Sequence, residues 1–323
     1  MMKFRKDYFL NLYAIDLLII SFATLLTLLN IIFASKVDAW INHIFYNTLF
    51  SIFILFIANI NAANKSPFWE QLHDWYILPT IFISFKEIYF MVKPIAGVDS
   101  DQYLIAIDKF IFGINPTQYL YQFSNPILTE VLQIAYSTFF FLPIILIVEL
   151  QFKKELLNFK FSEFSITLGF VLSYIGYFLV PAIGPRFTLH NFEMTNIELP
   201  GIWLTNYLRE IINAAESVPN GTLNPIEVVQ RDVFPSGHTL MTLIVMYLSY
   251  KFKTKFRYFI YPTGTLLIFA TVYLRYHYVI DVIAGLIFMI STMYLAKFFF
   301  NYWNKYRNKE FFEYKNNSIS NRK

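Results

Sequence analysis

Long apolar segments recur along almost the whole chain, and they constrain its fold more than any other feature. A membrane-spanning helix needs roughly 20 mostly apolar residues. About eight such stretches occur, over approximately 14–34, 44–63, 75–93, 127–149, 164–183, 235–250, 257–275 and 278–297. Only 15% of the 323 residues are charged, against about 25% in a soluble domain. The sequence therefore predicts an all-α, polytopic membrane helix bundle with about eight transmembrane helices.

Two segments do not fit this pattern. The stretch 99–123 is interrupted by Gly113-Ile114-Asn115-Pro116, so we expect an interfacial or re-entrant piece. The stretch 299–323 is polar and basic, and we expect a tail that frays into solvent. We therefore divide the chain into N-terminal transmembrane helices (1–70), a main membrane domain (75–298) and a basic cytoplasmic tail (299–323).

Composition excludes several classes of function. The chain has no cysteine, which rules out disulfides, zinc-thiolate sites and thiol nucleophiles. Its net charge of +4 is small and dispersed, so it does not indicate nucleic-acid binding; a charge bias of cytoplasmic loops explains it. Nothing in the sequence indicates an obligate protein partner.

Lysine and arginine predict the orientation. They gather at 3–6, 153–160, 251–257 and 305–309, and eight alternating spans place all four regions on one side. By the positive-inside rule both termini are then cytoplasmic, and the loops near 35–43, 94–126, 184–234 and 276–277 face outward. Short loops and a tail rich in Lys and Asn favour a bacterial inner membrane. This topology places Arg186, His238 and His277 at the outer ends of spans, which predicts a common site.

The first histidine lies in Pro235-Ser236-Gly237-His238, at the start of a span. Serine is a favoured N-cap, and glycine lets a ligand approach the backbone. A helix N-terminus attracts phosphate, so His238 would lie beside a bound phosphoryl group and could protonate a leaving oxygen. The alternative is an ordinary helix start with an interfacial histidine.

The second histidine is followed four residues later by Asp281, so both lie on one helix face. A carboxylate that accepts from one ring nitrogen fixes the tautomer and leaves the other nitrogen of His277 as a nucleophile. The alternative is an interfacial polar pair.

Three cations are candidates for phosphate binding. The guanidinium of Arg186, in Gly184-Pro185-Arg186, matches phosphate oxygens in two-point contact. Arg275 lies two residues before His277 and could add a second positive charge, or extend to the membrane interface. Lys86 adjoins Glu87 inside the third span, where charged groups usually face the bundle interior; the span could also simply end near Phe85.

In combination, the order Arg186, Ser236-Gly237-His238 and His277-x-x-x-Asp281 resembles the PAP2 (type 2 phosphatidic acid phosphatase) superfamily over roughly residues 75–297. The stretch Asp108-Lys109-x-x-Phe112-Gly113-x-x-Pro116, with Tyr136, is similar to its inositol-phosphotransferase-like branch, related to inositol phosphorylceramide synthase. The motif His277-Tyr278-x-x-Asp281-Val282 is also similar to that of sphingomyelin synthases.

The resemblance implies a PAP2-like six-helix catalytic core within 75–298 and a role for each matched residue. His277 would be the nucleophile that forms a phosphohistidine, His238 the acid for the leaving group, and Asp281 the orienting carboxylate. Arg186, Ser236 and Gly237 would bind phosphate. The resemblance implies no metal and no cofactor, because arginine and helix amides would stabilise the charge.

The chain departs from the phosphatase pattern at two positions. Leu179 stands where those phosphatases carry a lysine, and Thr271 stands where they carry an arginine. Arg275 and Lys86 are the candidates to replace these cations. The departures favour the phosphotransferase-like branch.

We therefore expect a membrane enzyme that acts on a phospholipid or sphingolipid-type substrate at the outer face. It would either hydrolyse the substrate or transfer a phospho-head group. The alternative is a non-catalytic lipid-binding or transport protein, which predicts charges spread through the membrane midplane and internal repeats; the sequence shows neither.

Overall fold

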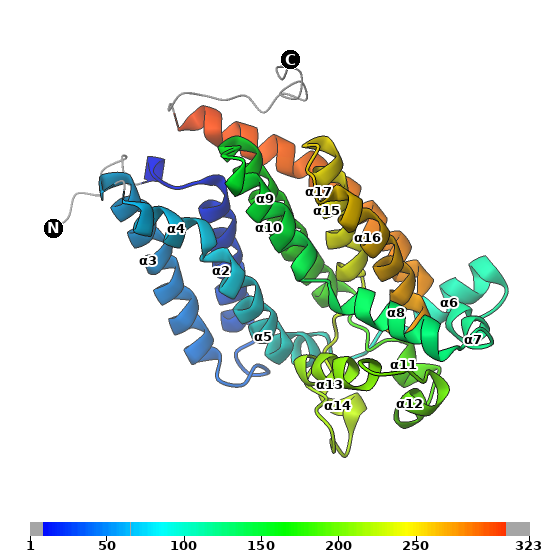
Figure 1. Ribbon diagram of the computed structural model, residues 1–323. Coiled ribbons are helices and arrows are strands. Elements are labelled where there is room, and N and C mark those ends of the chain that lie inside the picture. Colours follow the sequence, from blue (N-terminus) through cyan, green and yellow to red (C-terminus); the bar gives the residue numbers. More distant parts are fainter. Residues whose placement is uncertain (1–8, 65, 308–323) are drawn as a thin grey trace.

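The computed structural model describes residues 9–64 and 66–307, and within them the protein is helical without a strand (Figure 1). The predicted all-α bundle is confirmed. The N-terminal helices are α2 (Ala14–Ile32), α3 (Trp40–Asn64), α4 (Pro67–Trp75) and α5 (Ile77–Ala96). The longer helices that follow are α6 (Asp101–Phe112), α8 (Pro126–Ser137), α9 (Phe141–Phe152), α10 (Leu156–Leu179), α13 (Thr205–Ala215), α15 (Gly237–Lys251), α16 (Arg257–Tyr273) and α17 (Val279–Tyr306). The shorter ones are α7 (Pro116–Tyr121), α11 (Pro185–Thr188), η1 (Phe192–Met194), α12 (Thr195–Glu198) and α14 (Pro225–Val228).

Each of the eight predicted spans is helical, but fewer of them meet the length and hydropathy of a membrane span. Five do so in the described residues: α2, α3, α4 with α5, α10 and α17; a sixth results if α8 and α9, bent by 49°, form one span. The helices α15 and α16 have 15 and 17 residues, shorter than the roughly 20 that cross a bilayer. The apolar helices indicate a membrane protein.

Three other sequence predictions meet the structure differently. The segment 99–123 forms two separate helices, α6 and α7, with the predicted break between Phe112 and Pro116. The basic tail predicted from residue 299 begins inside α17, which continues to Tyr306. The basic residues 3–6 and most of the tail, 308–323, lie outside the described part of the chain.

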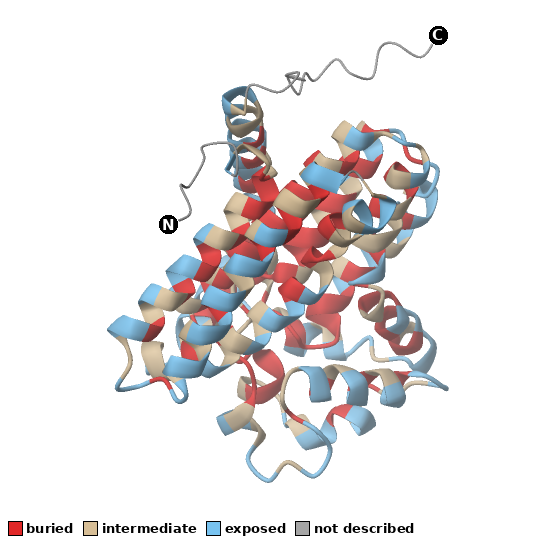
Figure 2. Cartoon of the chain, turned by 90° about the vertical axis from the view of Figure 1, so that its left-hand side faces the viewer, coloured by how far each residue is buried: buried red, intermediate tan, exposed pale blue. Residues whose placement is uncertain are grey.

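Helix α10 lies at the centre of the bundle and is buried on almost every side. Small residues recur along it, at Ser162, Ser165, Gly169, Ser173 and Gly176, and small residues let helix backbones approach closely in membranes. A Cβ at Gly169 would lie 2.2 Å from Met241 of α15. In Figure 2 the buried residues gather between the helices, and the exposed ones follow their outward faces.

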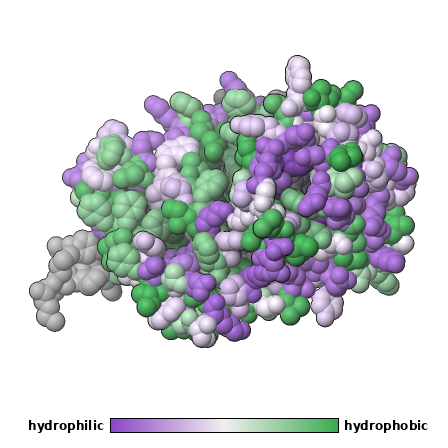
Figure 3. Space-filling model, turned by 90° about the horizontal axis from the view of Figure 1, so that it is seen from below, coloured by the Kyte–Doolittle hydropathy of each residue, from purple (hydrophilic) through white to green (hydrophobic). Residues whose placement is uncertain are grey.

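The candidate site residues lie at one end of the bundle. The segment 184–236, with α11 to α14, covers that end, and we call it the outer cap (Figure 1). The start of α2 and the end of α17 lie at the opposite end, together with the basic loops after α9 and α15. Seen from below in Figure 3, the capped end is more hydrophilic over the cap than over the N-terminal helices. Of the four basic regions, 153–160, 251–257 and the described part of 305–309 thus lie at the end of the bundle opposite the site.

Candidate active site

His277 lies in the turn between α16 and α17, and its ring is held by the backbone. Nδ1 is 2.9 Å from the carbonyl oxygen of Val233. Because a carbonyl only accepts, Nδ1 carries the proton and Nε2 keeps a free lone pair. Burial lowers the pKa of His277 to about 4, so the ring is neutral at pH 7.

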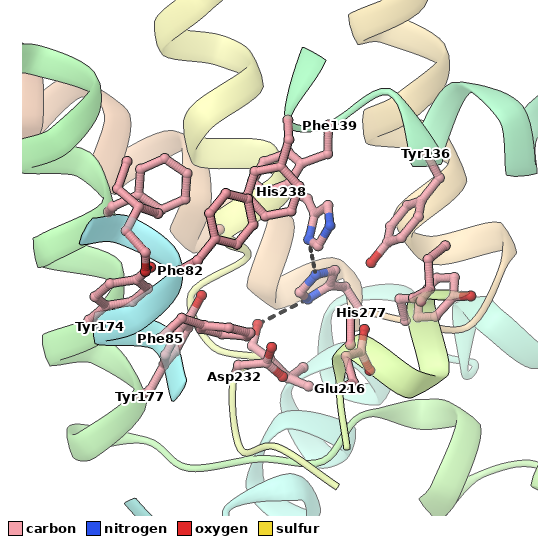
Figure 4. Close-up of a pocket in the computed structure, with 18 of the residues that line it drawn as sticks. Phe82, Phe85, Tyr136, Phe139, Tyr174, Tyr177, Glu216, Asp232, His238 and His277 are labelled. Atoms are coloured by element: carbon pink, nitrogen blue, oxygen red, sulfur yellow. Dashed lines mark hydrogen bonds between the residues drawn. The ribbon is translucent and has the colours of Figure 1, made fainter. Parts of the chain in front are cut away.

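His238 faces His277 across a short gap. Its Nδ1 is 3.5 Å from Nε2 of His277, as Figure 4 shows. The imidazole of His238 is stacked with the ring of Tyr136 at 4.4 Å and lies 4.1 Å from the ring of Phe139. Tyr136 lies in the last turn of α8 and Phe139 lies in the break before α9. The bend between these helices therefore places two aromatic rings that fix the histidine.

The two histidines line a cavity of about 950 Å³, which includes its open mouth. Most of its wall is apolar and aromatic, contributed by α5, α8, α10 and the break before α9 (Figure 4). The polar groups gather at the end beneath the outer cap. They are Tyr136, Ser137, Tyr177, Arg186, Glu216, Asp232, His238, Tyr276 and His277. A cavity that is apolar along most of its length and polar at one end fits an amphiphile.

Arg186 supplies positive charge to this cavity, and of the lysines and arginines in residues 9–64 and 66–307 it alone lines the wall. Its guanidinium is buried, donates to Asn213 at 2.8 Å and forms an ion pair with Glu216. The preceding Gly184 has φ of +92°, and a Cβ there would lie 2.9 Å from the carbonyl oxygen of Tyr276. Only glycine fits this close approach, so it sets the path of the loop that brings Arg186 to the cavity.

The first turn of α15 lies at the cavity wall. Gly237 lines it, and a Cβ at this position would lie 2.8 Å from the hydroxyl of Tyr177. Ser236, which we expected to bind phosphate, is fully buried and caps the helix instead: its Oγ accepts from Thr239 N–H at 3.2 Å. The amides of Gly237 and His238 are at the positions that a helix leaves without an internal acceptor.

Asp281 lies beside Nδ1 of His277, as expected, but does not form a hydrogen bond to it. Its Oδ2 lies 3.6 Å from Nδ1 of His277, whereas it accepts from the backbone N–H of Tyr278 at 2.8 Å. The Val233 carbonyl takes the ring proton instead. The reason is geometric, because Asp281 is the third residue of α17 and a carboxylate there reaches back to the N-cap amide.

Neither candidate replacement cation lines the cavity. Arg275 is 1% exposed and forms an ion pair with Glu198, over the ring of Tyr121. Lys86 donates to the carbonyl of Ala215 at 2.7 Å and so joins α5 to the outer cap. The positions matching the family's missing cations do not reach the cavity either: Leu179 is exposed at the end of α10 and Thr271 is buried under the turn.

Two charged cavity residues have no counterpart in the sequence predictions, Asp232 and Glu216. Asp232 precedes Val233, and its charge raises the pKa of His277, opposing the effect of burial. Glu216 follows α13 and pairs with Arg186. The one available signal was the pair Arg231-Asp232 just before the first histidine motif; Glu216 lies in a polar stretch where no spacing singles it out.

A sequence model of the PAP2 superfamily matches residues 102–295, which is 194 of the 323 residues and includes both histidines, Arg186 and Asp281. The chain belongs to the PAP2 superfamily. No curated protein and no solved structure matches it. Members of this superfamily are generally phosphoesterases, and membership suggests phosphatase or phosphotransferase activity on lipids. In this PAP2 chain the match begins at α6 and leaves α2 to α5 outside it.

Proposed function

We propose that the protein is a lipid phosphatase or phosphotransferase that works through a phosphohistidine on His277, without a metal, at the outer face of the membrane. The observation that supports this most is the pairing of two histidines, 39 positions apart, at the polar end of an apolar cavity. Two facing imidazoles can supply a nucleophile and a proton donor to one phosphoryl group that enters between them.

In the first half-reaction Nε2 of His277 attacks phosphorus, and a P–N bond forms while the P–O bond to the leaving group breaks. Protonated His238, whose Nδ1 faces His277, gives its proton to the departing oxygen. The phosphoryl group takes the place of the direct contact between the two rings. A neutral His277 suits this step, because the proton on Nδ1 leaves the Nε2 lone pair free.

In the second half-reaction an acceptor hydroxyl attacks phosphorus and gives its proton to the now neutral His238. The P–N bond breaks and His277 returns to its starting state. Water as acceptor makes the protein a phosphatase, and a lipid hydroxyl makes it a transferase. Arg186 and the first-turn amides of α15 stabilise the charge on the phosphoryl oxygens.

The two carboxylates of the cavity favour transfer of a phospho-head group over hydrolysis of a bare phosphate. Asp232 and Glu216 lie near the polar end of the cavity, where they repel a doubly charged phosphate monoester. They accept hydrogen bonds from hydroxyls or amines, such as those on the head group of a phosphodiester lipid. This supports the similarity to the inositol-phosphotransferase-like branch.

The test measures phosphate release from phosphatidic acid and head-group transfer from a phosphodiester lipid to ceramide or diacylglycerol. It uses the purified protein in detergent with EDTA. We expect transfer that survives EDTA and is lost in His277→Ala. Phosphate release instead of transfer would make the protein a phosphatase, and loss of either activity in EDTA would contradict the metal-free mechanism. Neither reaction, with His277→Ala indistinguishable, would leave the non-catalytic alternative of lipid binding or transport.

A further inference from the structure

A second cavity, of about 1120 Å³, lies between α2, α3 and α5. It is separated from the catalytic cavity by a single helix. One face of α5 gives Ile81, Phe82 and Phe85 to the catalytic cavity, and the other gives Ile83, Ser84 and Glu87 to the second. This second cavity lies outside the residues that match the PAP2 model.

Polar groups gather at one place in this apolar cavity. Glu87 Oε1 accepts from the side-chain amides of Asn47 at 2.8 Å and Asn30 at 3.1 Å. Glu87 and Asn47 line the cavity. Glu87 lies nine residues before the end of α5 at Ala96, which is roughly 13 Å along the helix. Polar groups at such a depth are costly in a membrane, and they mark functional sites.

The atoms left over in this cluster are mostly acceptors. Both amides donate to the same carboxylate oxygen, which leaves Oε2 of Glu87 without a hydrogen bond among the described residues. Asn30 is fully buried, and its Oδ1 has no partner. His43 Nδ1, 3.8 Å from Glu87 Oε1, is also unpartnered. Of these three residues, Glu87 lines the cavity, so a ligand there meets the carboxylate Oε2 and can donate a hydrogen bond to it.

The charges near Glu87 limit which head group can donate the hydrogen bond. In the described part of the chain no lysine or arginine forms an ion pair with Glu87, so an ammonium head group could pair with it. Burying a charged head group in an apolar cavity, however, costs far more than burying a hydroxyl. The walls offer apolar side chains, including Ile19, Leu26 and Phe50, to an acyl chain. We propose that this cavity binds a neutral lipid whose head group is a free hydroxyl, of the mono- or diacylglycerol type. The hydroxyl donates to Glu87, and the acyl chain lies between α2 and α3.

The test is photolabelling of the full-length protein with a monoacylglycerol that carries a diazirine in its acyl chain. We expect label on peptides of α2, α3 and the Glu87 face of α5. Glu87→Leu removes the acceptor and should weaken labelling there about tenfold, as loss of one hydrogen bond to a carboxyl group does. Glu70→Gln changes an exposed carboxylate of α4 and should leave labelling unchanged.

Two further variants test the cavity itself and separate it from the proposed catalysis. Ala23→Phe fills the cavity from α2 without touching the polar cluster and should also abolish this label. His277→Ala should leave it intact, so the second site can stand or fall apart from the proposed catalysis. Equal labelling by the analogue with methylated hydroxyls, or stronger labelling by the matching long-chain amine, would overturn the hydroxyl assignment. Label found only on residues of the catalytic cavity would contradict lipid binding in the second cavity.

Discussion

At the scale of single residues, one backbone carbonyl decides the tautomer of the proposed nucleophile, His277. The Val233 carbonyl accepts from Nδ1 of His277, and Nε2 is left for phosphorus. The charge of Asp232 raises the pKa of the same ring, although burial outweighs it and lowers that pKa to about 4. Hydrogen bonding thus fixes the tautomer, and burial keeps the ring neutral.

The pKa of His277 predicts where kcat/KM falls on the acidic side of its pH profile. Because His277 loses nucleophilicity only when protonated, its own titration should place the acid limb of kcat/KM near pH 4. Asp232→Asn removes the charge that raises the pKa, so the limb should move to still lower pH. A phosphodiester substrate keeps its charge over pH 3–8 and serves for the measurement. An acid limb of kcat/KM near pH 6.5, or a limb that moves to higher pH in Asp232→Asn, would contradict this account.

His238 should act in proton transfer rather than in binding. His238→Ala should lower kcat by roughly 10² to 10⁴, the usual contribution of a positioned acid, with little change in KM. The control is His190→Ala, since His190 bonds to Thr117 at 3.0 Å and does not line the cavity. Steady-state kinetics of both variants decide the matter, and a His238 effect confined to KM would speak against the acid role.

Residue types and spacing predicted part of the site. Arg186, Gly237, His238 and His277 share the cavity because the end of α10, the start of α15 and the turn between α16 and α17 lie at one end of the bundle. The contacts of Asp281 and Arg275 could not be predicted from the sequence. A side-chain rotamer decides whether Asp281 caps α17 or contacts the ring of His277, and another decides which ion pair Arg275 forms. The roles of all these residues stay predictions until activity is measured.

At the scale of helices, the apolar lengths predicted where helices occur, whereas remote carboxylates decide how they begin. Glu149 accepts from Lys255 and Phe256 N–H, at 2.5 and 3.0 Å, before α16. Glu130 likewise accepts from the amides of Ile202 and Leu204, before α13. These partners are more than 70 positions apart, so no local pattern could reveal them.

The carboxylate with the most direct bearing on the site is Asp108 of α6. It accepts from the N–H groups of Val279 and Ile280, both at 2.8 Å, and so holds the start of α17 next to His277. Asp108→Ala should destabilise the protein by about 1–3 kcal/mol, the cost of leaving buried amides unpaired, and lower activity with it. Thermal unfolding in detergent measures this loss. The control is Asp38→Asn, at an exposed carboxylate. If the unfolding temperature of Asp108→Ala is unchanged, α6 does not hold the start of α17 in place.

At the scale of the whole molecule, the cavities suggest how a lipid lies in the bundle. An apolar cavity of about 600 Å³ between α5, α9 and α10 shares Ile81, Phe82, Phe140 and Phe170 with the catalytic one. It leads away from the outer cap toward the end that holds Asp74 and Glu163. An acyl chain can follow this path while its phosphate stays at the histidines.

A bulky side chain in this cavity should weaken the binding of long-chain substrates and not of short-chain ones. Ile144 lines the far cavity but not the catalytic one. In Ile144→Trp the added bulk should raise KM for a long-chain substrate about tenfold, equivalent to about 1.4 kcal/mol of lost binding, and leave a short-chain substrate unaffected. Kinetics with a series of chain lengths measure the effect. Equal losses for both substrates would place the acyl chain elsewhere.

The most direct test of the central claim is to look for the phosphohistidine itself. The purified protein is incubated with a lipid labelled in its phosphate and quenched in alkali, where a phosphohistidine survives, and its peptides are analysed by mass spectrometry. The account predicts phosphate on Nε2 of His277, and none in His277→Ala. Turnover of the lipid without a covalent intermediate, or phosphate on another residue, would contradict it.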